Sequence, residues 1–362
     1  MTTLCITVAV KAENTNHLSM RKFILPGLIM AVLAAAFFFW QPLQSLYLSK
    51  VPAGVENQYV NIPTGSSFED LVQILKTQRV IGDENAFRYA AAQMKFIKPV
   101  MRPGRFKIET GWNYRQLINH LRIGEQAPVK VVFNSTERLP EEIAGKAARF
   151  IEADSLEILN VMRDPAFLAQ FNYTPETAIS ACIPNTYEMY WNTDGQAFFK
   201  RMVKEHDIFW SKNDRLSKAQ ALHLTPAEVY TLASIVERET NYQPERPTVA
   251  GVYLNRLRIG MKLQADPTCV FATRDFKTRR VTQVHTSFNS PYNTYMYYGL
   301  PPGPISVASI PSIDAVLNHD AHNFLYFCAK PDDSGTHAFA ATLQGHNVNA
   351  DKFRAWLRTQ GR

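Results

Sequence analysis

Two glutamates at the end of an apolar helical run, Leu232–Asn241, are the residues with the clearest chemical potential. At about 100° per residue, Glu239 projects between Leu232 and Ile235, while Glu237 projects on the other margin of the apolar stripe. Apolar neighbours and the negative helix end both disfavour an ionised carboxyl and raise its pKa, as a general acid near neutral pH requires. A solvated last-turn side chain is the alternative. We favour that alternative for Glu237, whereas for Glu239 the periodicity leaves both interpretations open.

The helix that must carry these glutamates begins at a strong start signal. Thr225 is a good N-cap, Pro226 suits the first helical position, and Glu228 completes a capping box. Apolar residues then recur at helical spacing: Val229, Leu232, Ala233 and Val236. We therefore expect a core-facing helix that ends at the two glutamates.

Polar segments after this helix are expected to orient a substrate. Val249–Arg258 predicts a second helix, which ends before Gly260, and Gln264–Thr268 then supplies an amide, a carboxylate and a hydroxyl. Ser290–Tyr295 and Gly299–Ile305 are rich in Pro, Gly and polar residues, a composition that fixes the shape of a loop. Rigid polar loops beside a buried carboxylate indicate a cleft that binds a polar substrate.

An internal repeat precedes these segments. Ile62–Leu75 aligns with Ile108–Leu121, and each copy predicts a short strand, a glycine turn and an amphipathic helix. Lys130–Phe133 and Leu139–Ile143 repeat the strand and the helix more loosely. Two copies are too few for a solenoid, so we expect a small α+β module. An inert spacer and a carbohydrate-binding role are both open for this module.

Two segments between the repeat and the glutamates have a weaker signal. Asp154–Leu168 predicts one helix with apolar residues near one face. Ile183–Trp191 predicts a loop rich in aromatic and polar side chains. Aromatic rings stack on sugars, so this loop is a candidate groove wall, although ordinary aromatic packing beside a turn is the interpretation we favour.

Composition excludes several classes of function. The 362 residues are 46% hydrophobic and 12% aromatic, which fits globular folding, and the net charge of +7 is spread along the chain. No basic cluster is interleaved with aromatic residues, so we expect no nucleic-acid partner. Cys5, Cys182, Cys269 and Cys328 have neither a disulfide framework nor metal-ligand spacing, and the nine histidines form no HExxH motif. We expect no metal and no cofactor.

An N-terminal segment predicts a membrane anchor. Residues 23–40 contain no charge, and the apolar character continues weakly beyond them. Lys11, Arg21 and Lys22 precede the segment against a single Glu13, so the positive-inside rule places the short tail in the cytoplasm. A cleaved signal peptide is the alternative, but residues 37–40 would then begin the mature chain with Phe-Phe-Phe-Trp. We therefore favour an uncleaved anchor.

Several motifs in one order resemble the MltG (YceG-like) family of endolytic murein transglycosylases. These motifs are Ala233–Thr240, Val252–Leu257, Leu263–Thr268, Tyr292–Tyr295 and Gly299–Pro304. The resemblance covers most of the chain outside the predicted anchor.

The resemblance implies an α+β fold with a single N-terminal transmembrane helix, a small LysM-like α+β subdomain and a larger α+β catalytic domain. The expected parts are a cytoplasmic tail (1–22), the anchor (23–43), the LysM-like subdomain (55–128) and the catalytic domain (129–362). The protein is expected in the bacterial cytoplasmic (inner) membrane as a single-pass protein, with its catalytic part on the periplasmic side. The expected partners are peptidoglycan glycan strands and the inner membrane, with cell-wall synthases as a further candidate.

The family's catalytic residue is the second carboxylate of the Glu-x-Glu pair, which falls on Glu239. Further polar residues in or beside the motifs are candidates for holding the N-acetyl and hydroxyl groups of the substrate: Asn255, Gln264, Asp266, Thr268, Tyr292 and Asn293.

The reaction that the resemblance implies is cleavage of the MurNAc–GlcNAc bond within nascent strands, which leaves 1,6-anhydro-MurNAc ends and terminates strand elongation. The chain is thus expected to be a lytic transglycosylase, a carbon–oxygen lyase. Two alternatives remain open: a lysozyme-like hydrolase with Asp266 as the partner of Glu239, and a non-catalytic anchored module that binds glycan. Product masses distinguish the hydrolase from the transglycosylase, because hydrolysis adds a water to the products and transglycosylation does not. The binding module would show no cleavage at all.

Overall fold

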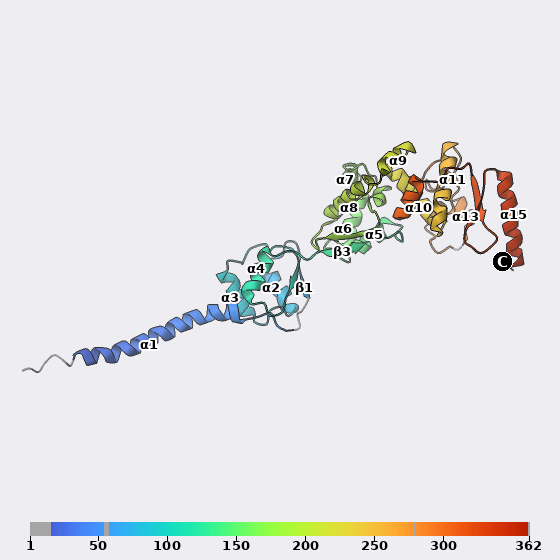
Figure 1. The fold of residues 1–362 in the computed structure, drawn as a ribbon. Coiled ribbons are helices and arrows are strands. Elements are labelled where there is room, and N and C mark those ends of the chain that lie inside the picture. Colours follow the sequence, from blue (N-terminus) through green and yellow to red (C-terminus); the bar gives the residue numbers. More distant parts are fainter. Residues whose placement is uncertain (1–15, 54–57, 279, 361–362) are drawn as a thin grey trace, which may run out of the picture. The chain divides into compact units, whose positions relative to one another are not determined.

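The computed structural model describes residues 16–53, 58–278 and 280–360, and it separates into two compact units, residues 1–127 and 128–362 (Figure 1). Cys5, Lys11 and Glu13, which entered the predictions about the N-terminal tail, lie outside the described residues. Each unit has its own hydrophobic core.

The N-terminal helix α1 (Asn16–Leu43) continues into a short π-helix, η1 (Gln44–Leu48). Pro26–Leu48 has a mean hydropathy of 1.6 and is, within the described residues, the one stretch of helix long and apolar enough to cross a membrane. A signal sequence would meet the same criterion. The side of the membrane on which the rest of the chain lies stays a prediction.

The rest of the first unit alternates strands and helices around one core. Its elements are β1 (Gln58–Ile62), α2 (Phe68–Thr77), α3 (Glu84–Gln93), β2 (Gly104–Ile108) and α4 (Tyr114–Ile123). Strands β1 and β2 pair antiparallel, with Val60 opposite Phe106. Both of these side chains are fully buried, as are the apolar faces of α2 and α4.

The internal repeat appears in this unit as two strand–turn–helix copies. Gly65 and Gly111 follow β1 and β2 with φ of +84° and +80°, a region that favours glycine. Ser67 and Asn113 then cap α2 and α4, each within a capping box. The same local signals thus produce the same local structure twice.

The second unit is mostly helical. Its strands and short 3-10 helices are β3 (Val129–Val132), β4 (Thr186–Met189), β5 (Tyr326–Ala329), β6 (His337–Ala340), η2 (Ala178–Ala181) and η3 (Gln243–Glu245). Its helices up to the glutamates are α5 (Pro140–Ala147), α6 (Ser155–Arg163), α7 (Pro165–Ala169), α8 (Gly195–Trp210), α9 (Arg215–Ala221) and α10 (Pro226–Glu239). The later helices are α11 (Arg246–Arg258), α12 (Asp266–Thr273), α13 (Gln283–Thr286), α14 (Ile310–Leu317) and α15 (Leu343–Thr359). With antiparallel pairs β3–β4 and β5–β6, the described chain mixes helices with small two-stranded sheets.

Two sequence-based expectations about this unit were wrong. The single helix expected over Asp154–Leu168 is broken into α6 and α7, because Pro165 has no N–H to continue a helix and Asp164 caps the new one. The loop expected over Ile183–Trp191 contains strand β4, in which Tyr187 is buried between exposed neighbours and pairs with Val131. The strand was missed because its period-two pattern is only four residues long and its partner strand lies more than 50 residues upstream.

Helix α10 lies at the centre of the second unit and contacts α9, α11, α12 and α14 (Figure 1). The capping box predicted at Thr225 and Glu228 is present, and Pro226 occupies the first turn. Every residue from Val229 to Val236 is at most 2% exposed, so the helix is buried all round and not only along one stripe. This packing holds the end of the helix in a defined place.

Candidate active site

Glu239 is the last residue of α10, and the next helix supplies its hydrogen-bond partner. The Tyr253 hydroxyl, from α11, donates to Glu239 Oε2 at 3.0 Å. Burial raises the pKa of Glu239 to about 7, although the Tyr253 hydrogen bond lowers it; Asp266 acts in the same direction as burial. A carboxyl of this kind exchanges a proton near neutral pH, which is the property of a general acid.

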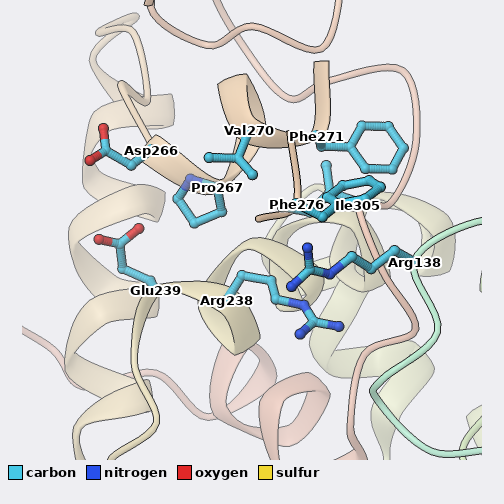
Figure 2. Close-up of a pocket in the computed structure, with 9 residues that line it drawn as sticks. All are labelled: Arg138, Arg238, Glu239, Asp266, Pro267, Val270, Phe271, Phe276 and Ile305. Carbon is cyan, nitrogen blue, oxygen red and sulfur yellow. The ribbon is translucent and has the colours of Figure 1, made fainter. Parts of the chain in front are cut away.

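Glu239 lines a pocket, which we call the acid pocket, with a volume of about 290 Å³ (Figure 2). Its lining comes from the ends of several elements: Arg138, Arg238, Glu239, Asp266, Pro267, Val270, Phe271, Phe276 and Ile305. Figure 2 shows the carboxyl groups of Glu239 and Asp266 on one side and the guanidinium groups and aromatic rings on the other. The pocket therefore joins acidic, cationic and apolar surfaces around one carboxyl of raised pKa.

Asp266 begins α12, and its side chain is exposed. The Tyr295 hydroxyl donates to Asp266 Oδ1 at 2.5 Å. Burial and this carboxylate both raise the pKa of Tyr295, so the phenol keeps its proton and remains a donor. The arrangement fixes the orientation of the Asp266 carboxyl group, which lines the same pocket as Glu239.

Glu237 has an environment unlike the solvated one that we expected, and that expectation was wrong. Its side chain is 10% exposed and forms an ion pair with Arg246 at 3.1 Å. The Ser309 and Ser312 hydroxyls donate to Glu237 Oε2, the latter at 2.6 Å. Burial alone would raise the pKa of Glu237, but these hydrogen bonds and Arg246 lower it. Glu237 is therefore a structural anion that ties α10 to α11 and α14.

Two arginines of the acid pocket were not among the sequence-based candidates. Arg238 lies inside the Glu-x-Glu motif, so its proximity to the site was foreseeable from the sequence. Arg138 lies about 100 residues upstream, in the turn before α5, and no local pattern marks it. Its guanidinium lies over the Phe276 ring, 4.7 Å from the centroid.

Three of the predicted substrate-binding residues use their polar groups inside the protein. The Asn255 amide donates to the backbone oxygens of residues 322 and 324. Thr268 is fully buried and bonds to Thr294 Oγ1 at 2.8 Å, and the amide of fully buried Asn293 donates to three carbonyls of residues 285–288. In this structure these side chains hold the loops around α11–α13 in place.

Gln264 and Tyr292 lie outside the acid pocket. Gln264 is exposed, adopts a φ of +50°, and donates its backbone N–H to Thr294. Tyr292 packs against Phe271, with 4.8 Å between ring centroids, and lines a second pocket together with Phe271. Of the predicted set, Asp266 alone shares the acid pocket with Glu239.

The loop Gly299–Ile305 reaches the site through a close backbone approach. A Cβ at Gly303 would lie 2.0 Å from the carbonyl oxygen of Glu176, so no other residue fits there without movement. Ile305 donates its backbone N–H to Ser234 Oγ and adds an apolar side chain to the acid pocket. The glycine thus allows the loop to form one wall.

Residues with metal-binding side chains are dispersed across the described parts of the chain. No group of three or more His, Cys, Asp or Glu residues is close enough there to hold a metal ion. Cys182 and Cys269 are buried free thiols, and burial raises their pKa values to about 12 and about 11.

Comparison with known proteins gives relatives over most of the chain. The chain is 28% identical over 315 residues to the endolytic murein transglycosylase of Bacillus subtilis (strain 168), covering 81% of this chain and 84% of that protein. It is 23% identical over 321 residues to the endolytic murein transglycosylase of Streptococcus pneumoniae (strain R6), covering 80% of this chain and 57% of that protein.

A solved structure supports the same relationship. The crystal structure of a putative yceG-like protein from Listeria monocytogenes matches with a TM-score of 0.54 and 27% identity, covering 81% of this chain and 98% of that one. The model of the YceG-like family matches residues 60–352, which confirms the resemblance inferred from the motifs. The chain belongs to the YceG-like family.

Proposed function

We propose that this chain is a lytic transglycosylase that cleaves within peptidoglycan glycan strands. The observation that carries the proposal is the carboxyl of Glu239, which has a pKa of about 7 and lines the acid pocket. Relatives with the name endolytic murein transglycosylase support the same activity.

Glu239 first acts as the acid. Its protonated carboxyl donates to the glycosidic oxygen that leaves C1 of MurNAc, which breaks the C1–O bond. The resulting carboxylate then accepts the proton of the MurNAc 6-hydroxyl, whose oxygen attacks C1 and closes the 1,6-anhydro ring. Glu239 ends in its initial protonated state, no water is consumed, and one residue supplies both proton transfers.

The surroundings of Glu239 suit both steps. Burial favours the neutral acid before cleavage, and the Tyr253 hydroxyl stabilises the carboxylate after it. The apolar wall of Phe271, Phe276 and Ile305 excludes water from one side of the pocket. Asp266, held by Tyr295, is positioned to accept hydrogen bonds from substrate hydroxyl or amide groups.

Hydrolysis is the second candidate, because Asp266 places another carboxylate in the acid pocket. In a hydrolase this carboxylate would act as base or nucleophile in the two-carboxylate manner. Digestion of purified strands in H₂¹⁸O, followed by mass spectrometry, separates the two reactions. Transglycosylation gives anhydro ends without ¹⁸O, whereas hydrolysis adds one labelled water per cleavage and would overturn the lytic assignment.

We further propose that the first unit is the LysM-like glycan-contacting subdomain and that α1 is an uncleaved anchor in the inner membrane. The two strand–turn–helix copies and the apolar stretch Pro26–Leu48 support these assignments. The catalytic unit is then periplasmic, where nascent strands and cell-wall synthases are accessible. Protease protection in spheroplasts, with and without permeabilisation, tests the orientation.

A further inference from the structure

The acid pocket carries two positive charges that a neutral sugar does not require. Arg138 and Arg238 both line it. The two guanidinium groups are close enough for the charge of Arg138 to repel that of Arg238. Arginine side chains stay protonated at neutral pH. Two like charges beside a catalytic carboxyl are unfavourable unless an anion accompanies them.

Neither arginine forms an ion pair with a carboxylate of the described residues, although Glu237, Glu142 and Glu137 are near enough to act on Arg238 through space. By contrast, Arg246 pairs with Glu237, and Arg215 pairs with Asp314 at 2.9 Å. Arg238 Nη2 donates to the Ser135 carbonyl at 2.5 Å, which holds the side chain in place.

The donors of the two guanidinium groups are not exhausted. Arg238 Nε is buried without a partner in the described chain, an arrangement that costs free energy until an acceptor arrives. The Arg138 guanidinium packs over the Phe276 ring. The pair therefore forms a cationic site with guanidinium donors that no carboxylate of the described residues occupies.

The chemistry of the proposed substrate indicates which anion binds. The alternating N-acetylated sugars of peptidoglycan carry no ionised group, because the lactyl carboxyl of MurNAc is consumed in an amide bond to a short peptide. That peptide stem does carry free carboxylates, and it branches from the same sugar whose C1–O bond breaks. A planar guanidinium matches a carboxylate in geometry and charge.

We propose that Arg138 and Arg238 bind a free carboxylate of the peptide stem, so that the enzyme selects peptide-bearing strands over denuded ones. This inference rests on the proposed function and adds its substrate class. The second pocket offers room for more of the stem. It has a volume of about 240 Å³, and Phe271 lines both pockets. Its charged lining residues are Arg274, Glu176 and the ion pair of Arg163 with Glu141.

Three forms of one strand preparation test the proposal: strands with acidic stems, strands with amidated stem carboxylates, and strands denuded by an amidase whose freed lactyl carboxyl groups are then converted to methyl amides. The wild-type enzyme should cleave acidic-stem strands with a kcat/KM about 10-fold or more above that for the other two, since one charge-assisted hydrogen bond is worth at least about that factor. In Arg138→Gln this ratio should fall towards one, and Arg138→Lys should retain part of it.

The ratio within one variant is independent of how much of the preparation is folded, so misfolding cannot imitate the effect. Arg149→Gln is the matched control: Arg149 is exposed, lies in the same unit outside the acid pocket, and its loss changes the net charge equally. The control should keep the wild-type ratio. Added salt should lower the ratio for the wild type, because it screens exposed charges.

Two results would overturn the inference. One is equal cleavage of all three strand forms by the wild-type enzyme. The other is an unchanged ratio in both Arg138→Gln and Arg238→Gln. Failure of the proposed function looks different: no strand form would be cleaved, or Glu239→Gln would cleave as fast as the wild type.

Discussion

Glu237 and Glu239 stand two residues apart on one helix, yet their surroundings drive their pKa values in opposite directions. Glu237 meets a guanidinium and two hydroxyls, which more than compensate for its burial. Glu239 meets one hydroxyl and another carboxylate, and burial dominates. The same residue type, turned by about 200° around the helix, is part of an ion-pair network on one side and is a carboxyl group of raised pKa on the other.

The two carboxyl groups also differ in how many of their hydrogen bonds are formed within the protein. Glu237 is part of a closed network, so its hydrogen-bonding capacity is used within the protein. Glu239 has one hydrogen bond from the described protein and an open pocket before it. A buried carboxyl group that has one hydrogen bond and faces a pocket is typical of an active site, where pKa values are often shifted.

The largest expected effect is the loss of catalysis in Glu239→Gln. The amide keeps the shape but has no proton to donate, so kcat should fall about 10³-fold, within the range that general acid catalysis contributes. Release of anhydro-muropeptides by the purified protein is the measurement. Glu188→Gln, on the exposed edge of β4, is the matched control and should stay within about twofold of the wild type. Normal release of anhydro products by Glu239→Gln would falsify the assignment.

The next largest effect should be the loss of stability in Glu237→Gln. Removal of one partner of a buried ion pair leaves Arg246 uncompensated and should cost about 3 kcal/mol of unfolding free energy. The variant is therefore a poor control for activity, contrary to the mild effect expected from a solvated side chain. Urea unfolding at pH 7 measures the loss, and a midpoint equal to that of the wild type would show that the network contributes nothing.

The pH dependence of stability should have opposite signs at the two positions. The pKa of Glu237 is lowered in the folded state, so its contribution is present above the unfolded pKa of about 4.5 and is lost as pH falls further. The pKa of Glu239 is raised to about 7, so the folded state becomes less stable as pH rises from about 4.5 through 7.

Glu239→Gln should consequently gain about 1–3 kcal/mol over the wild type at pH 8, because a pKa difference of one corresponds to about 1.4 kcal/mol. At pH 4 the two proteins should be equally stable. Thermal unfolding across this range measures both values, and a gain that is constant with pH would contradict the raised pKa.

The smallest effect should come from Tyr253→Phe. The Tyr253 hydroxyl stabilises the Glu239 carboxylate, so its loss should raise the pKa of Glu239 and move the alkaline limb of the pH–rate profile up by about one pH unit. Tyr230→Phe is the matched control, since the Tyr230 hydroxyl donates to the Cys182 carbonyl within the core. It should lose stability without any shift of the profile. A downward shift in Tyr253→Phe would show that Glu239 is tuned by other groups.

Local sequence signals predicted a large part of the helical framework correctly. The capping box at Thr225, the glycine after α11 and the two repeated strand–turn–helix copies all depend on neighbours within about five residues. The same logic failed where a distant strand was needed, at β4, and where one proline divided a helix, at Pro165.

The chain by itself determined where α10 begins and ends and that a carboxyl at position 239 has bulky apolar neighbours, because helix periodicity and capping are local. Only the tertiary structure decided what each polar group faces. It supplied Ser309 and Ser312 to Glu237, and it brought Arg138 into the acid pocket from about 100 residues upstream. It also turned the Thr268 and Asn293 side chains inward. Electrostatic partners act through space, and no spacing along the chain encodes which of them will meet.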